Sequence, residues 1–245
     1  METYLRTSPL SVPHQSVLRK SALPVLVGWG LLLACSQVQA VGGIALGATR
    51  IIYEQGAKQA ALPVRNSNKD TTFLIQSWVD GEDGKKSADF VVTPPLFSLK
   101  PASENSVRII FVGEGAPTDR EQVYYFNSKA IPAVDKSTMG SNTLQIAVQS
   151  EIKIFLRPEG LSMKVTEAPA LLRCQVQGDN LVVTNPSPYY VSLAGSTVGG
   201  EQIEGGMVEP KGSLSLPVKG ARGEVKLRTI NDFGALTEPL PCPAS

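Results

Sequence analysis

The side chains that most often carry catalysis are scarce in this 245-residue chain. Its one histidine, His14, lies in an N-terminal stretch that we expect to be removed. Without it the chain lacks the commonest general base, the usual activator of a nucleophile and the commonest zinc ligand. No glycine-rich phosphate loop or metal-spaced cluster replaces it. The sequence therefore predicts a non-enzymatic protein with no cofactor, no metal and no small-molecule substrate. An exported hydrolase with a Ser–Lys arrangement is the alternative, although no motif places the two side chains together.

The cysteines carry the remaining side-chain chemistry. Removal of the N-terminal stretch would take Cys35 and leave Cys174 and Cys242. An even pair of cysteines in an exported chain indicates a disulfide, which would stabilise the fold by ~4 kcal/mol in the chain-entropy model. The alternative is two free thiols.

Residues 143–157 suggest that the main chain itself is the functional group. Side chains alternate between the two faces of a strand, so apolar residues at every second position share one face. A strand here would run to ~14 residues, against a typical ~5–6, and a small sandwich cannot cover all of it. We expect residues 144–148 to overhang as an apolar edge, and such edges pair with other chains. The alternative is that this face fills its own core. The alternating residues are Leu144, Ile146, Val148, Ile152, Ile154 and Leu156.

The N-terminus has the three parts of a signal peptide: basic residues at Arg6, Arg19 and Lys20, an apolar stretch at 22–34, and a small-residue cleavage site at 38–40. We predict a signal peptide over residues 1–40 and a mature chain from Val41. Cleavage before Cys35, as in lipoproteins, and retention of residues 21–49 as a membrane anchor are alternatives. Removing three of the 23 basic and one of the 22 acidic residues leaves a net charge of −1. That balance argues against a nucleic-acid partner.

Short apolar segments separated by turn signals predict an all-β chain of two sandwiches. Arg157-Pro158-Glu159-Gly160 interrupts the pattern and predicts a hinge, which gives domains at 41–157 and 158–245. Seven strands are predicted before the hinge, at 44–53, 61–65, 72–79, 90–92, 106–112, 122–128 and 143–156. Six shorter runs follow it, at 171–176, 181–184, 189–194, 206–208, 214–218 and 224–230.

Four segments together resemble one family. They are ATRIIY at 48–53, PTDREQVYYFN at 117–127 with Ile131 and Pro132 downstream, LQIAVQSEIKIFLRP at 144–158, and NPSPYYV at 185–191 with INDFG at 230–234. The chain is similar to periplasmic pilus-assembly chaperones of the chaperone–usher pathway, and its short segment at 133–142 resembles their short-loop branch. The resemblance implies two immunoglobulin-like domains in an L-shaped arrangement with an interdomain cleft. It also implies a periplasmic chaperone that binds, folds and caps pilus subunits and delivers them to an outer-membrane usher.

The resemblance also implies roles for particular residues. The donated edge strand would present Leu144, Ile146 and Val148 to the subunit, and Arg50 and Lys153 would anchor the subunit's C-terminal carboxylate. An ion cluster of Glu121, Arg157 and Asp232 would join the two domains, unless these are ordinary surface charges. Leu74, Gln76, Thr93, Pro95 and Leu96 align with an usher-docking patch, although core packing would explain Leu74 or Leu96 equally well.

The last expectations concern self-association and the alternative function. The free protein could cap its own apolar edge by forming a dimer. A structural fimbrial subunit or adhesin with the same fold is the alternative function, but such a subunit should lack its last strand, whereas this chain has a long seventh one.

Overall fold

The computed structural model describes residues 42–134 and 144–244. The predicted signal peptide, both predicted cleavage sites and most of segment 133–142 lie outside these residues. Buried apolar side chains form two separate cores, one between Ile51 and Leu156 and one between Ala168 and Leu227. Each core lies inside a β-sandwich, so the all-β, two-domain prediction is confirmed. No helix in the described ranges has the length and apolar character needed to cross a membrane.

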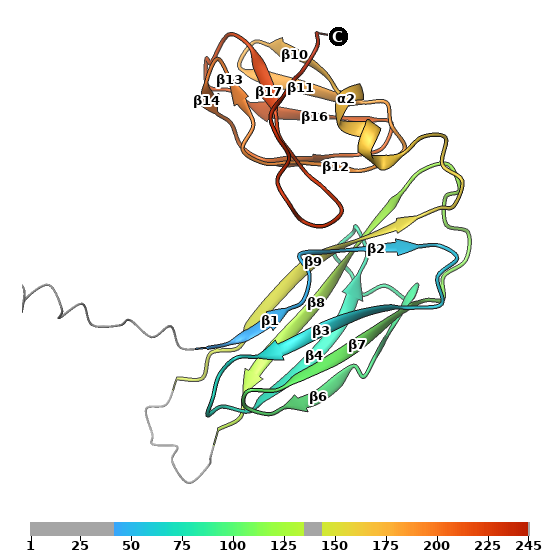
Figure 1. Cartoon of the computed structure of the whole chain (residues 1–245), viewed down its shortest axis with the longest axis vertical. Coiled ribbons are helices and arrows are strands. Elements are labelled where there is room, and N and C mark those ends of the chain that lie inside the picture. Colours follow the sequence, from blue (N-terminus) through green and yellow to red (C-terminus); the bar gives the residue numbers. More distant parts are fainter. Residues whose placement is uncertain (1–41, 135–143, 245) are drawn as a thin grey trace, which may run out of the picture. The chain divides into compact units, whose positions relative to one another are not determined.

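The first sandwich packs a five-stranded sheet against a four-stranded one. The five-stranded sheet has the order β2-β9-β8-β4-β6 and the four-stranded sheet the order β1-β3-β7-β5 (Figure 1). Both sheets contribute to one core that includes Tyr53, Phe90 and Phe126. The strands are β1 (Ile44–Leu46), β2 (Arg50–Glu54), β3 (Ala60–Asn66), β4 (Phe73–Asp80), β5 (Phe90–Thr93), β6 (Leu96–Leu99), β7 (Glu104–Phe111), β8 (Gln122–Pro132) and β9 (Val148–Arg157).

The predicted first strand, 44–53, is two strands in different sheets. β1 pairs antiparallel with β3, whereas β2 pairs parallel with β9. The chain crosses between the sheets at residues 47–49, where Gly47 N–H donates to Pro63 O at 2.8 Å. A Cβ at Gly47 would lie only 3.0–3.1 Å from the Pro63 ring, so glycine permits this close approach. The switch leaves one side of β9 with a neighbour along only part of its length, because β2 pairs with it only from Lys153 to Arg157.

A second difference lies after the double proline. Residues 96–99 form β6, which no prediction included. The chain passes from β5, at the edge of the four-stranded sheet, through a cis Thr93–Pro94 peptide to β6, at the edge of the five-stranded sheet. Both strands are at edges, which is where a proline without an N–H donor can be accommodated.

The second sandwich is built mostly from short strands, in three sheets of three or four strands. The three sheets have the orders β10-β11-β16, β15-β12-β18 and β14-β13-β17-β19. The bounds are η1 (Val165–Glu167), α2 (Ala168–Leu171), β10 (Arg173–Gln177), β11 (Asn180–Asn185), β12 (Val191–Leu193), β13 (Thr197–Val198), β14 (Glu201–Gln202), β15 (Gly206–Val208), β16 (Gly212–Pro217), β17 (Val225–Leu227), β18 (Thr229–Ile230) and β19 (Leu240–Pro241). The predicted run 224–230 is split between two sheets at Arg228, and β13, β14 and β19 were not predicted.

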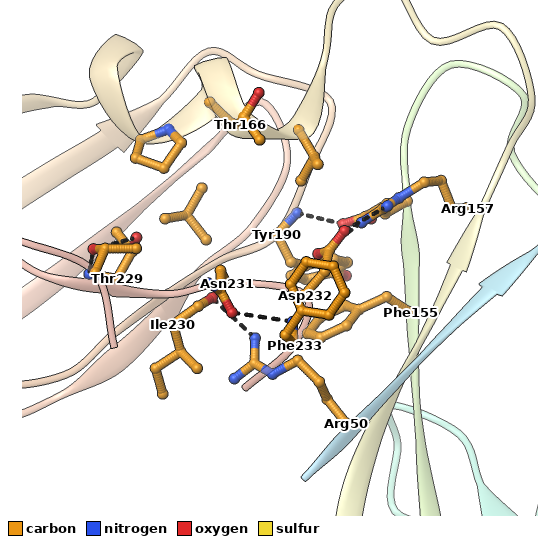
Figure 2. A pocket seen from close by; sticks show the side chains of 16 residues that line it. Arg50, Phe155, Arg157, Thr166, Tyr190, Thr229, Ile230, Asn231, Asp232 and Phe233 are labelled. Carbon is orange, nitrogen blue, oxygen red and sulfur yellow. Dashed lines mark hydrogen bonds and ion pairs between the residues drawn. The ribbon is translucent and has the colours of Figure 1, made fainter. Parts of the chain in front are cut away.

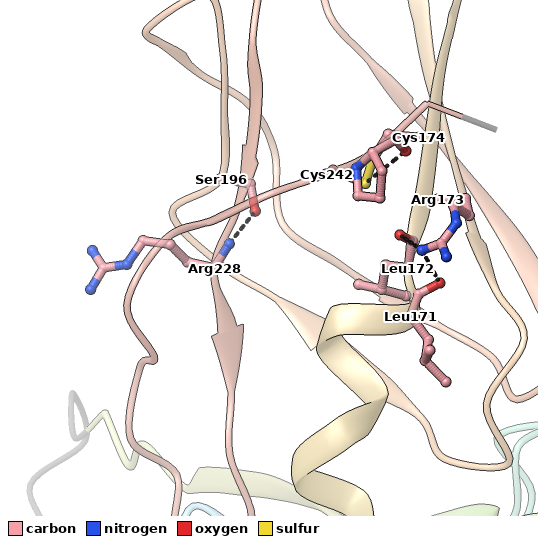
Figure 3. The surroundings of a disulfide bond; sticks show 8 residues. Leu171, Leu172, Arg173, Cys174, Ser196, Arg228 and Cys242 are labelled. Atoms are coloured by element: carbon pink, nitrogen blue, oxygen red, sulfur yellow. Dashed lines mark hydrogen bonds between the residues drawn. A yellow bond between two sulfur atoms is a disulfide. The ribbon is translucent and has the colours of Figure 1, made fainter.

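Cys174 and Cys242 form the predicted disulfide (Figure 3). It joins β10 to the C-terminal segment across 68 positions of sequence. Cys174 N–H also donates to Pro243 O at 2.9 Å. The covalent bond and the backbone bond together fix the end of the chain on the second sandwich.

Candidate functional site

Strand β9 has an open edge over its first half. On one side it pairs with β8 from Val148 to Leu156, as neighbours in the five-stranded sheet (Figure 1). On the other side it pairs with β2, but only from Lys153 onward. Residues 148–152 therefore have backbone groups facing no strand of the described chain, and residues 144–147 lie before β9 outside either ladder. Such an edge is a template for another chain.

The apolar side chains along this edge are uncovered. Leu144 is 83% exposed, Ile146 65% and Val148 60%, whereas Ile154, further along the same face, is 0% exposed. The long strand predicted at 143–156 is correct only from Val148, and Thr143 lies outside the described residues. The preceding residues have no strand partner, and backbone groups need one to form a ladder.

Arg50 and Lys153 lie directly opposite each other on β2 and β9. Tyr125 is opposite Lys153 on its other side, in β8. The three residues line a small hollow of about 90 Å³ together with Thr49, Glu151 and Ile152. Two cations thus meet where the open edge ends and β2 begins. This arrangement can hold an anion at the end of an added strand by charge-assisted hydrogen bonds.

The Arg50 guanidinium is held in place yet keeps unused donors. Its Nη1 donates to Ile230 O at 3.1 Å and its Cζ lies 5.7 Å from the centre of the Phe155 ring. Its Nε is buried without a hydrogen-bond partner among the described residues. Figure 2 shows Arg50 reaching from β2 toward residues Ile230 and Asn231. Burial lowers the pKa of Arg50, opposed by Asp232 and Glu121, but arginine remains charged in proteins.

The predicted ion cluster is assembled around Arg157. Its Nε donates to Glu121 Oε1 at 2.7 Å, and its two Nη atoms donate to the Asp232 carboxylate at 2.8 and 3.1 Å (Figure 2). Arg157 ends β9, Glu121 precedes β8, and Asp232 follows β18 in the second sandwich. Glu121 Oε2 also accepts from Tyr190 N–H at 2.8 Å. The cluster therefore joins residues of both sandwiches.

The five residues predicted to contact the usher are all exposed. Leu74 is 37% and Leu96 53% exposed, so neither is a core residue. Gln76 on β4 lies opposite Leu96 on β6. Gln76, Leu96 and Pro95 border a hollow of about 480 Å³ on the five-stranded sheet, with Lys86 and Lys129 among its other lining residues.

Comparison with family models identifies both sandwiches. Residues 43–162 match the model described as "Pili and flagellar-assembly chaperone, PapD N-terminal domain". Residues 167–239 match "Pili assembly chaperone PapD, C-terminal domain". The chain belongs to the PapD family of pilus-assembly chaperones. This family membership supports the chaperone function and not the alternative, a structural fimbrial subunit.

Individual relatives agree with the family. The chaperone is 46% identical over 216 residues to the probable fimbrial chaperone protein ElfD of Escherichia coli, covering 86% of this chain and 92% of ElfD. It is 44% identical over 205 residues to the E. coli chaperone protein FocC, covering 82% and 90%. Among solved structures, the periplasmic chaperone SfaE superposes with a TM-score of 0.74 at 41% identity, covering 82% of this chain and all of SfaE. The SafB chaperone of Salmonella enterica, solved in complex with SafA pilin, gives 0.75 at 33% identity, covering 83% and 97%.

The charges of the chaperone's ion cluster depend on one another. Burial raises the pKa of the Glu121 carboxyl, and the Arg157 guanidinium opposes this shift. Burial lowers the pKa of Arg157, but its hydrogen bonds and attraction to Asp232 and Glu121 outweigh burial, so the net shift is upward. Glu121 is only 3% exposed, so loss of Arg157 would leave its carboxylate buried without a counter-ion.

Replacing Arg157 by alanine should lower the free energy of unfolding by about 3 kcal/mol, because breaking a buried ion pair leaves one charge uncompensated. A Glu121→Gln, Arg157→Met, Asp232→Asn triple variant should cost less than Arg157→Ala, because no charge is left behind. Urea unfolding measures both. Lys211→Ala is the matched control, since it removes an exposed ion pair of 2.6 Å with Asp119 and should change stability little. Equal midpoints for Arg157→Ala and Lys211→Ala would contradict this assignment.

Several residues of the site were not predicted. Glu54 places a carboxylate oxygen 3.8 Å from Arg157 Nη1, as a fourth member of the cluster. Phe233 is 95% exposed on a turn in which Asn231 Oδ1 accepts from the N–H groups of Phe233 and Ala235. Gly234 ends this turn at φ +81°, and a Cβ there would collide with Thr49 Oγ1. The glycine in INDFG is a signal from which a tight turn could have been predicted, but nothing in the sequence indicates an aromatic ring presented to solvent.

Proposed function

We propose that this chaperone binds a pilus subunit in the periplasm by lending residues 144–152 as an edge strand to the subunit's incomplete sheet. The observation that carries the proposal is the open edge of β9, with Leu144, Ile146 and Val148 exposed beside it. A soluble protein normally blunts or covers such an edge. Strand addition would pair the backbone groups, while the alternate side chains fill a groove in the guest.

The proposed anchor implies a direction for the guest strand. β2 runs parallel to β9 and takes over as its neighbour at the Arg50–Lys153 pair. A guest strand whose last residue reaches those cations must lie along residues 144–152 and end beside Lys153. It therefore runs parallel to β9, in line with β2.

The two cations give that strand a fixed end point. A C-terminal carboxylate is present on every chain, so Arg50 and Lys153 can hold a guest without reading its sequence. Holding the end also fixes the register, and a slip of one residue would turn every apolar side chain of the guest to the wrong face. We assign the cations this role of anchor and the Glu121–Arg157–Asp232 cluster the role of setting the angle between the sandwiches.

Relatives support the partner and the compartment. SafB, a relative by structure, was solved in complex with a pilin, and SfaE is described as periplasmic. The Cys174–Cys242 disulfide fits an oxidising compartment.

We further propose that residues 1–40 are a cleaved signal peptide, that the protein catalyses no reaction, and that the exposed patch around Gln76 and Leu96 docks on the outer-membrane usher. In the absence of a guest, two copies could cover each other's open edges.

The test is co-expression with a pilus subunit in bacteria that lack their own chaperone. The subunit should be recovered from the periplasm in complex with this protein, and should be degraded or aggregated when expressed alone. Equal recovery of soluble subunit with and without the chaperone would refute the proposal.

A further inference from the structure

One acidic side chain lies beside the two anchor cations. Glu151 precedes Lys153 by two positions on β9, so the two side chains share the outer face of the five-stranded sheet. On the β8 side Glu151 lies opposite Asn127. On the other side β2 begins only at Arg50, opposite Lys153. No strand of the described residues therefore pairs with Glu151 on that side.

The Glu151 carboxylate is available to a ligand. The residue is exposed, lines the same small hollow as Arg50 and Lys153, and forms no ion pair with a lysine or arginine among the described residues. Its charge acts on this face: Tyr125, opposite Lys153, has its pKa raised by burial first and then by Glu82 and Glu151. The hollow therefore holds one carboxylate, that of Glu151, beside the two anchor cations.

We infer that Glu151 forms a side-chain subsite that selects guests with a basic residue among their last three positions. The inference rests on the proposed function, because a guest strand running parallel to β9 would occupy the empty place beside Glu151. Its terminal carboxylate would meet Arg50 and Lys153, and the side chain in register with Glu151 would lie on the same outer face. A lysine or arginine there pairs with the carboxylate, and an aspartate or glutamate is repelled.

The subsite distinguishes guests by the charge of one side chain, which the two anchor cations do not do. Every guest ends in a carboxylate, so the two cations hold all chain ends alike. A charge beside them distinguishes guests by attraction to one and repulsion from another. Strand alternation limits the effect to one position, since the residues before and after it turn to the opposite face.

The probe is a set of acetylated 14-residue peptides of alternating threonine and valine with a free C-terminal carboxylate. A single lysine or glutamate is walked through the last three positions, and each peptide is titrated against the mature chain. At one position the lysine peptide should bind about threefold more tightly than the glutamate peptide, as expected for an exposed ion pair. Glu151→Lys should reverse that order by a similar factor. Glu104→Lys is the matched control: Glu104 is exposed on β7 in the opposite sheet, so the same change of charge there should leave the lysine-to-glutamate ratio unaffected.

The outcomes separate this inference from the proposed function. If free-carboxylate peptides bind more tightly than amidated ones, but the lysine-to-glutamate ratio is the same for the natural chain and Glu151→Lys at all three positions, the subsite is refuted and the strand-donation function stands. If amidated and free peptides bind equally, or none binds, the anchor is refuted, and the subsite with it, because nothing then fixes the register.

Discussion

Replacing Lys153 or Arg50 by alanine is expected to abolish recovery of a co-expressed pilus subunit. Loss of one partner from a charge-assisted contact that binding desolvates costs roughly 2–5 kcal/mol, which is a thirtyfold or greater loss of affinity. The fold should persist, because neither side chain belongs to the core of the first sandwich. Co-purification from periplasm measures capture, and thermal unfolding of the free variants measures the fold.

Arg108→Ala is the matched control for the anchor. Arg108 is an exposed cation on β7, in the opposite sheet, so its loss should leave capture unchanged. Undiminished subunit recovery with both Lys153→Ala and Arg50→Ala would exclude these residues as the anchor.

The second large effect is expected from Ile146→Asp, which should reduce capture at least tenfold without destabilising the free chaperone. Ile146 is 65% exposed in the free protein, so aspartate there remains hydrated until a guest buries it. Burial of an unpaired carboxylate in an apolar groove is costly, and the cost falls on the complex alone. Capture and melting temperature are measured together.

Ile154→Asp provides the contrast on the same face of the same segment. Ile154 is 0% exposed and belongs to the core, so this variant should fail to fold. If Ile146→Asp also loses its cooperative unfolding transition, Ile146 is a core residue and the donated edge is wrong.

From the sequence, we predicted which side chains share a face of a strand more accurately than which strands pair with each other. Alternation at Ile152, Ile154 and Leu156 correctly identified one face of β9, because the side-chain period of a strand is a local property. Residues 44–53 were predicted as a single strand, although the chain changes sheets at residues 47–49. The core-facing positions shift there from Ile44 and Leu46 to Ile51 and Tyr53, so the period of two is interrupted. A period of two says which side chains share a face, and it does not say which strand pairs with which.

Some features of the candidate site also follow from the local sequence pattern, whereas others depend on tertiary pairing. Exposure of Leu144, Ile146 and Val148 followed from the length of the apolar run relative to a small sandwich. The grouping of Glu121, Arg157 and Asp232, which are far apart in sequence, came only from resemblance to a family. Glu54 joins this group because the parallel register places it opposite Arg157, and that register is set by tertiary pairing. Two-residue strands such as β13 and β14 are too short to carry a pattern of their own.

The most direct test of strand donation is amide hydrogen exchange, residue by residue, in the mature chaperone with and without a bound pilus subunit. Among residues 144–152, the alternate amides that point away from β8 should exchange quickly in the free protein and become strongly protected in the complex. If the complex forms while these amides exchange as quickly as before, the subunit is held by some other surface.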